Sequence, residues 1–214
     1  SIAGAGPHVI TPGSDLPAIT ELVAVDGSTD VNPGPGDDEI RLDGANTVTT
    51  GLDVEGAAGV EIRELSITRF IVGLDLADTT DVEVEDSHVG TNEAGAASLG
   101  NSGGIRLGSG TAPATGASIS SSVISGNSSY GVQIADSASD GNTITGNLIG
   151  TTPGGASALA NGVGVTVIDG ADDTVIGGAT LAEGNVVSGN TSTGIEVLAS
   201  ATEPATGSTI RPAT

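Results

Sequence analysis

The chain has 214 residues and a formal net charge of −22, because 27 acidic residues face only five arginines and no lysine. Such a surface repels nucleic acid and anionic lipid, so we exclude nucleic-acid binding and direct membrane insertion. With no Cys, Met or Trp and only one Phe and one Tyr, any core must be built from Val, Ile, Leu and Ala. The absence of cysteine also excludes disulfide bonds.

Residues 1–45 are predicted to form an opening coil of short strands. Apolar pairs and triplets at Val9-Ile10, Val23-Ala24-Val25 and Ile40-Arg41-Leu42 alternate with prolines and glycines that interrupt regular structure. Each run is long enough for one short strand and too short for a helix.

From residue 46 to 214 one short pattern recurs: a glycine followed by an apolar, a variable and an apolar residue. The period of two indicates a strand with one buried face. Identical strands that must cover each other predict an all-β fold, a right-handed single-stranded parallel β-helix of about seven coils in one domain, 1–214. The six copies start at Gly51, Gly73, Gly104, Gly131, Gly164 and Gly194.

A second repeated strand is predicted from a five-residue interval between apolar residues, as in Ile62 to Ile67. The segments Gly90 to Gly104 and Gly150 to Gly164 are equally long and similar in sequence, which indicates matching loops on different coils. Because the chain stops soon after a strand begins, we expect the native polypeptide to continue or another subunit to cover that end.

The segments Gly6-Pro7-His8, Leu16 to Thr20, Asn142 to Thr151 and Gly184 to Asn190 resemble those of secreted, pectate-lyase-like right-handed parallel β-helix proteins on bacterial and archaeal surfaces. This resemblance implies an extracellular or cell-surface location. The family includes lyases, hydrolases, phage tailspikes, adhesins and spacers, so the fold alone does not decide the function. The lysine-free acidic composition resembles proteins of extreme halophiles, and an acidic secreted protein from a GC-rich organism is the alternative.

The variable residue of each glycine strand should point outward and form a ladder with rungs ~4.8 Å apart. A parallel ladder places Glu61 against Glu83, Arg63 against Glu85 and Glu64 against Asp86. These faces are either solvated acidic surfaces with weak salt bridges or sites for calcium or sodium, with candidate ligands Asp53, Asp75, Glu83, Glu85 and Asp86. No cofactor is required. The predicted outward ladder is Arg41, Asp53, Asp75, Arg106, Gln133, Thr166 and Glu196.

No residue set is predicted to be catalytic. A polysaccharide lyase needs a base beside the substrate carboxylate, and the five arginines form no cluster in the rung alignment. A hydrolase needs paired carboxylates, and Asp172-Asp173 is the only adjacent aspartate pair in the repeats. His88 aligns with Leu148 and Val186, which is typical of a strand residue.

Asn127 and Asn190 begin Asn-X-Ser/Thr triplets at equivalent turns and are candidate N-glycosylation sites. The alternative is that each asparagine adopts the left-handed backbone conformation of its turn.

We therefore expect a non-catalytic extracellular structural or adhesive module adapted to high salt, with cell-surface glycans or other copies of itself as partners. Two alternatives remain: a glycan-binding or polysaccharide-cleaving domain, for example of a virus spike, and a subunit of an end-to-end filament.

Overall fold

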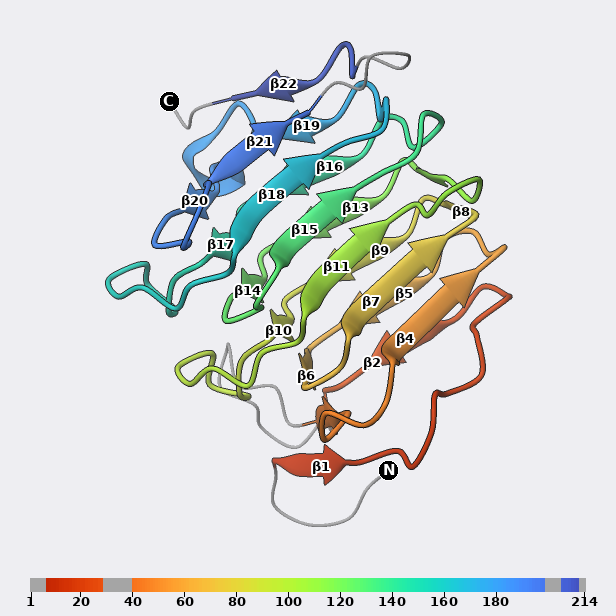
Figure 1. The fold of residues 1–214 in the computed structure, drawn as a ribbon, viewed down its shortest axis with the longest axis vertical. Coiled ribbons are helices and arrows are strands. Elements are labelled where there is room, and N and C mark those ends of the chain that lie inside the picture. Colours follow the sequence, from red (N-terminus) through yellow and green to blue (C-terminus); the bar gives the residue numbers. More distant parts are fainter. Residues whose placement is uncertain (1–6, 29–39, 199–204, 212–214) are drawn as a thin grey trace.

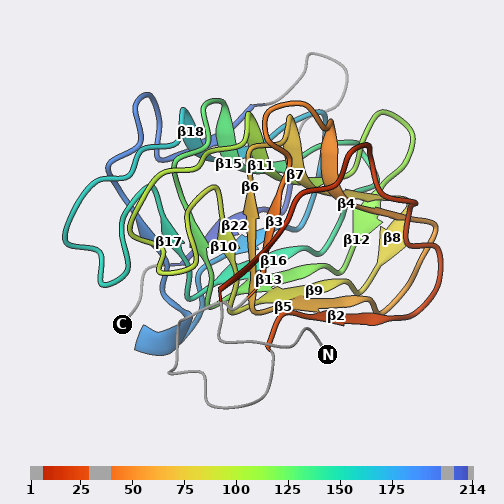
Figure 2. The same ribbon diagram turned by 90° about the horizontal axis from the view of Figure 1, so that it is seen from below.

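The computed structural model describes residues 7–28, 40–198 and 205–211, and nearly all regular structure in them is β-strand. The strands stack along one axis, with β1 and β22 at opposite ends of the stack (Figure 1). Seen along that axis, three sheets enclose a narrow interior (Figure 2). No helix among the described residues is long and apolar enough to cross a membrane.

Sheet 1 is parallel throughout and contains, in spatial order, β1 (His8–Ile10), β3 (Ile40–Asp43), β6 (Leu65–Thr68), β10 (His88–Val89), β14 (Val123–Ile124), β17 (Leu148–Ile149) and β20 (Val186–Val187). Sheet 2 contains the glycine strands β4 (Thr50–Glu55), β7 (Val72–Ala77), β11 (Gly103–Leu107), β15 (Tyr130–Ile134), β18 (Val163–Val167) and β21 (Ile195–Val197).

Sheet 3 contains β2 (Ala24–Asp26), β5 (Glu61–Arg63), β9 (Glu83–Glu85), β13 (Ser118–Ser120), β16 (Thr143–Thr145), β19 (Val175–Ile176) and β22 (Thr209–Ile210). A small accessory sheet pairs β8 (Thr79–Thr80) with β12 (Ala114–Thr115), and a single 3₁₀ turn, η1 (Leu181–Glu183), precedes β20. Sheets 1 and 3 each have seven strands, which confirms a parallel β-helix of seven coils.

The register of sheet 2 places the same repeat position in one file. Leu76 pairs with Leu107, Leu107 with Ile134, and Ile134 with Val167, and all four are fully buried. Equivalent files run through sheet 3 along Ile62, Val84, Ile119 and Ile144 and through sheet 1 along Ile67, Val89, Ile124 and Ile149. A second buried file of sheet 2 runs along Leu52, Leu74, Ile105, Val132 and Val165, so the core consists of stacked columns of mainly aliphatic side chains, as the composition requires.

The prediction of one second strand with a five-residue interval was wrong in detail, because Ile62 and Ile67 lie on different sheets. A corner residue with positive φ turns the chain between sheet 3 and sheet 1, so both isoleucines point inward. The corner residues are Glu64 (φ 53°), Asp86 (46°), Ser121 (51°) and Gly146 (66°). Three of the four are not glycine, which is why the corner left no glycine signal in the sequence.

The two matching loops leave the solenoid on the same side (Figure 1). Each is closed by one antiparallel bridge, Thr91 to Ser98 in the first and Thr151 to Ala158 in the second. Both are thus short excursions within one coil, and the strands on either side keep their register.

Candidate functional site

The outer face of sheet 2 carries the charged ladder predicted from the repeat. Its register runs through Asp53, Asp75, Arg106, Gln133, Thr166 and Glu196. Arg41 was wrongly placed in this ladder: it lies on β3 of sheet 1, where its register partner is Ser66. The error arose because the Ile-Arg-Leu segment has the alternation of the glycine strand without its glycine.

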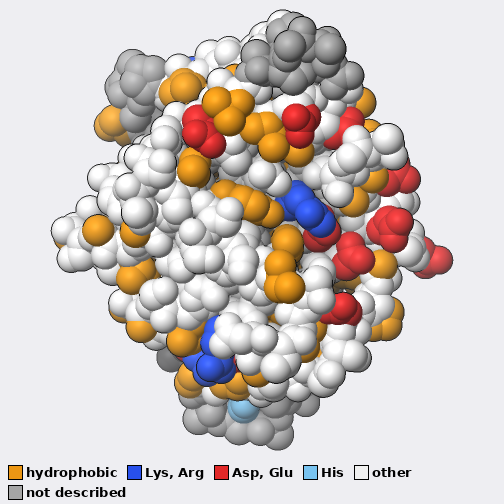
Figure 3. Space-filling model, viewed as in Figure 1, with side chains coloured by type: hydrophobic (Ala, Val, Ile, Leu, Met, Phe, Trp, Pro, Cys, Tyr) orange, Lys and Arg blue, Asp and Glu red, His pale blue; other side chains and the backbone are white. Residues whose placement is uncertain are grey.

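Asp75 and Arg106 form a two-pronged ion pair across adjacent rungs. Arg106 Nε donates to Asp75 Oδ1 at 2.8 Å, and its Nη2 donates to Asp75 Oδ2. The hydrogen bond to Asp75 is the main reason that the pKa of Arg106 lies above its ordinary value. On this face one basic group lies near the centre with acidic side chains beside it, over β4 and β7, and a second basic group lies lower on the face (Figure 3).

Asp53 lies next to Asp75 but takes no part in the Asp75–Arg106 ion pair. Burial raises the pKa of the Asp53 carboxyl, and the negative charges of Asp75 and Glu55 raise it further, while Arg106 offsets only part of this effect. The ionised carboxylates of Asp53 and Asp75 therefore repel each other.

Tyr130 extends the same face toward the next coil. A Cβ on Gly103 would lie 2.3 Å from Tyr130 Cζ, so the tyrosine ring lies across that glycine and would have to shift to admit a larger residue. Burial raises the pKa of the Tyr130 hydroxyl, and nearby Arg106 opposes that shift. A partly exposed aromatic ring thus lies beside a rigid guanidinium–carboxylate pair.

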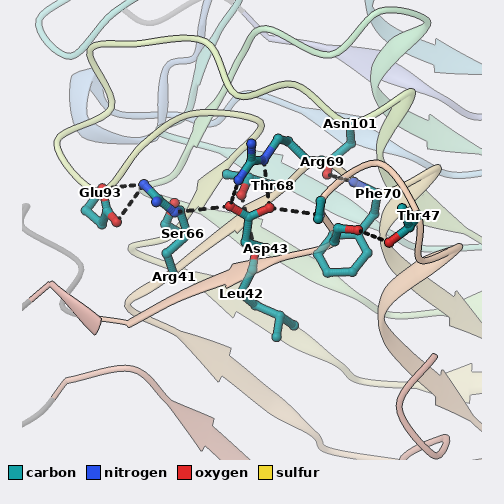
Figure 4. A network of polar contacts seen from close by, with 12 residues as sticks. Arg41, Leu42, Asp43, Thr47, Ser66, Thr68, Arg69, Phe70, Glu93 and Asn101 are labelled. Atoms are coloured by element: carbon teal, nitrogen blue, oxygen red, sulfur yellow. Dashed lines mark hydrogen bonds and ion pairs between the residues drawn. The ribbon is translucent and has the colours of Figure 1, made fainter. Parts of the chain in front are cut away.

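A second polar network joins β3, β6 and the first loop (Figure 4). Asp43, with no exposed surface, accepts from Arg69 Nε at 2.7 Å and from the backbone N–H of Ala45 at 2.9 Å. Arg41 Nη1 lies 2.9 Å from Glu93 Oε1 of the loop, and Arg41 Nε lies 3.6 Å from Asp43 Oδ2. The network ties the first loop to the body of the solenoid.

Burial alone would raise the pKa of Asp43. The hydrogen bonds from Arg69 and from Ala45 N–H, together with the charges of Arg69 and Arg41, outweigh it and hold the pKa below its ordinary value. The pairing of Asp43 with Arg69 was not predicted, because Arg69 lies at an irregular turn with φ of 61° and belongs to no strand pattern.

The predicted ladder on sheet 3 is present. Glu61 pairs in register with Glu83 and Arg63 with Glu85, and Arg63 Nε also donates to Asp26 on β2 at 2.9 Å. Glu64 and Asp86 occupy equivalent corners rather than strand positions.

On the described part of the chain, no three acidic or histidine side chains come together in a metal-binding geometry. The structure therefore contains no preformed cation site there. Of the five candidates, Asp75 is engaged by Arg106, and Arg63 lies 4.0 Å from Glu85. Cation binding by any of the five stays a prediction.

Asn127 belongs to a buried ladder of asparagines that crosses four coils. Its Oδ1 accepts from the backbone N–H and from Nδ2 of Asn101, both at 3.1 Å, and its Nδ2 donates to Val89 O at 3.1 Å and to Asn161 Oδ1 at 3.0 Å. Asn161 repeats these bonds to Asn190, with its N–H at 3.2 Å and its Nδ2 at 3.0 Å from Asn190 Oδ1. The repeated Asn101/Asn161 and Ser-Gly-Asn motifs were the sequence signal for this ladder.

The two candidate glycosylation sites differ in how exposed their asparagine side chains are. Asn127 is fully buried and its amide already donates twice, whereas Asn190 is partly exposed. The turn interpretation also needs correction, since the left-handed conformation belongs to Gly126 (φ 81°) and Gly189 (φ 73°). Glycosylation stays a prediction, and at Asn127 it competes with a structural role.

Asp172 and Asp173 lie at a turn where Asp172 Oδ1 accepts from the backbone N–H of Thr206 in the next coil. The turn thus uses at least one oxygen of the pair to hold the backbone. His88 lies on β10 and is buried, with Gly95 of the first loop close to its ring. Its register continues through Val123 to Leu148 and Val186, as the alignment predicted.

Comparison with known proteins agrees with this architecture. A family model described as "Right handed beta helix region" matches residues 36–181, which is more than half of the chain. No curated protein and no solved structure matched the chain.

Proposed function

The chain belongs to the right-handed β-helix family, and we propose that it serves as a non-catalytic structural module of a secreted or cell-surface protein that works in concentrated salt. Its role is to act as an elongated, rigid spacer between other parts of an assembly. The observation that carries this proposal is the ladder system: backbone, aliphatic and asparagine ladders connect each coil to the next along the axis.

The arginines support a structural role. Arg41, Arg63, Arg69 and Arg106 each form an ion pair with an aspartate or glutamate, and most of these pairs join different coils. A guanidinium held in this way is a poor base for abstracting a proton from a sugar, because its charged form is stabilised.

Adaptation to salt is supported by the charge. With a formal −22 and no lysine, like charges repel across the whole body in dilute buffer. Molar salt shortens the screening distance to about 3 Å and removes most of that cost.

For adhesion we assign the outer face of sheet 2, where Tyr130 lies beside the Asp75–Arg106 pair. An aromatic ring next to planar polar groups suits a sugar, whose C–H face stacks on the ring while its hydroxyls bond to the charged groups. Cell-surface glycans are the ligand class that this face fits.

The proposal is tested by locating the protein and by assaying it in molar salt. Antibody labelling of intact producing cells should detect the chain outside, and incubation with acidic polysaccharides should release no products. Retention of a microbial glycan on immobilised protein should be lost in Tyr130→Ala and kept in Leu181→Ala, a variant of a side chain that is 75% exposed on η1, away from sheet 2. Cleavage that disappears in Asp172→Ala or Asp173→Ala would refute the non-catalytic role, and labelling confined to the cell interior would refute the location.

A further inference from the structure

The two matching loops each begin with a buried threonine, Thr91 in the first loop and Thr151 in the second. Thr91 has no exposed surface, and Thr151 is 2% exposed. Each follows a glycine with positive φ, at which the chain leaves sheet 1: Gly90 has a φ of 94° and Gly150 a φ of 89°. The two loops therefore build the same local structure twice, on different coils.

The hydroxyl groups of these two threonines have no protein partner. Within the described chain, neither Thr91 Oγ1 nor Thr151 Oγ1 takes part in a hydrogen bond, and both atoms are buried. The large majority of buried polar side-chain atoms in folded proteins have a partner, because an unpaired hydroxyl away from water is destabilising. The same exception at two equivalent positions points to a partner outside the polypeptide.

The backbone N–H of Thr91 is unpaired as well. Thr91 lies in the hairpin of the first loop, whose hydrogen bonds are made by its neighbours, from Asn92 N–H to Ala97 O at 3.0 Å and from Leu99 N–H to Gly90 O at 2.9 Å. In an antiparallel pair that lies between such bonds, the N–H groups point away from the partner strand. No described residue accepts a hydrogen bond from Thr91 N–H.

The second loop repeats this arrangement around Thr151. Its hairpin bonds run from Thr152 N–H to Ser157 O at 2.9 Å and from Leu159 N–H to Gly150 O at 2.8 Å. Among the described residues, none accepts a hydrogen bond from Thr151 N–H. The unpaired N–H at the start of the hairpin is therefore common to both loops.

The carbonyl group of each threonine, in contrast, is paired. Ser66 Oγ donates to Thr91 O at 2.7 Å, and Ser125 Oγ donates to Thr151 O at 2.9 Å. Each loop thus begins with one satisfied acceptor and with a backbone donor and a hydroxyl that lack partners. Because the two threonines are buried, these groups do not reach the bulk solvent.

We propose that the start of each loop binds one ordered water molecule, which accepts a hydrogen bond from the threonine N–H and forms a second one with Oγ1 of the same residue. Buried waters in globular proteins typically make about three hydrogen bonds to groups that are otherwise unsatisfied, and they occur about once per 27 residues. The two waters fasten the loops to the solenoid where the chain leaves sheet 1. The inference concerns the loops and does not rest on the function proposed for the protein.

Thr91→Val and Thr151→Val test the site, because valine keeps the shape of threonine and replaces its hydroxyl by a methyl group. If the hydroxyl is bonded to a water, each variant loses that bond, and we expect its melting temperature in molar salt to fall by about 2–4 °C. If the hydroxyl has no ligand, the change removes an unsatisfied group, and the melting temperature should rise. Thr111→Val, at an exposed residue of another loop, is the control and should melt within about 1 °C of the wild type.

A crystal structure of the wild type grown in molar sodium bromide identifies the ligand. It should show density at the same place in both loops, within hydrogen-bonding distance of the threonine N and Oγ1, without an anomalous signal from bromide. A bromide peak there would assign the site to a halide ion and overturn the inference. Sites that hold no density or are filled by protein atoms would overturn it as well, as would valine variants that melt at or above the wild-type temperature.

Discussion

Replacing Asn127 by alanine tests whether the buried asparagine ladder holds the coils together. The substitution removes two hydrogen bonds accepted from Asn101 and two donated to Val89 O and Asn161 Oδ1. It also leaves a small cavity at a position with no exposed surface.

The polar groups that Asn127 leaves behind differ in whether they keep another hydrogen-bond partner. Val89 O still accepts from Ser125 N–H, Asn161 Oδ1 still accepts from the backbone N–H of residue 127, and Asn101 Nδ2 keeps Ile67 O. The backbone N–H of Asn101 loses Asn127 Oδ1, its acceptor in this structure, and is orphaned in the interior. One orphaned buried donor costs about 1–3 kcal/mol, and the lost bonds and cavity add to it, so we expect the free energy of unfolding to fall by about 3–5 kcal/mol.

Urea unfolding in molar salt, followed by circular dichroism, measures this loss. The control is Asn92→Ala: Asn92 Oδ1 also accepts two backbone N–H groups, from Ala96 and Ala97, but in an exposed loop where water can replace it. The control should lose less than about 1 kcal/mol. Equal losses in the two variants would refute the claim that the ladder carries more stability than an ordinary turn.

Four further outcomes are expected. Asp53→Asn should raise the melting temperature at neutral pH, because the raised pKa of Asp53 means that its ionised carboxylate destabilises the folded state. The gain in melting temperature should vanish as the pH falls through that pKa. A variant that melts at a lower temperature than the wild type at neutral pH would contradict this. Asp43→Asn should destabilise the chain by about 2–4 kcal/mol at neutral pH. Since the pKa of Asp43 is lowered, its stabilisation is present above the ordinary value of 3.8 and is lost as the pH falls through the lowered pKa, so the variant should lose less stability on acidification than the wild type; parallel curves would exclude this role. Raising salt from about 0.1 M to molar concentration should increase the melting temperature, as screening weakens self-repulsion, and a fall would contradict the salt adaptation. Intact mass of protein from its native source should show no glycan at Asn127, while a glycan there would mean that the ladder is not formed in that material.

Most of the fold could be predicted from the sequence, because the repeat itself indicates which residues pair between neighbouring strands. Each glycine strand aligns with the next without a gap, so the pairing of Leu76 with Leu107 and of Asp75 with Arg106 followed from counting residues. The corners were harder. Glu64 and Asp86 adopt positive φ where glycine is usual, and nothing in their identity separates them from strand residues.

The polar interior was harder still, because its partners are distant in the chain and come from irregular segments. Arg69 reaches Asp43 across 26 positions, and Asn161 reaches Asn127 across 34. The Asn-X-Ser/Thr triplet at Asn127 suggested glycosylation, whereas the burial of its amide could be known only from the coil above and the coil below.

The matching loops and constant register have a consequence for evolution. Removing 104–130 would join Gly103 directly to Gly131 and bring β15 beside β7, with Ile134 against Leu76 and Ile149 against Val89 in the files that they already occupy. Asn161 would then be positioned to accept from Asn101 in place of Asn127. This deletion would remove Arg106, the partner of Asp75, and β12, the partner of β8, but it would leave the strand register and the aliphatic files continuous. Gene duplication or deletion of whole turns can therefore lengthen or shorten this protein while its core stays continuous, so its span is adjustable.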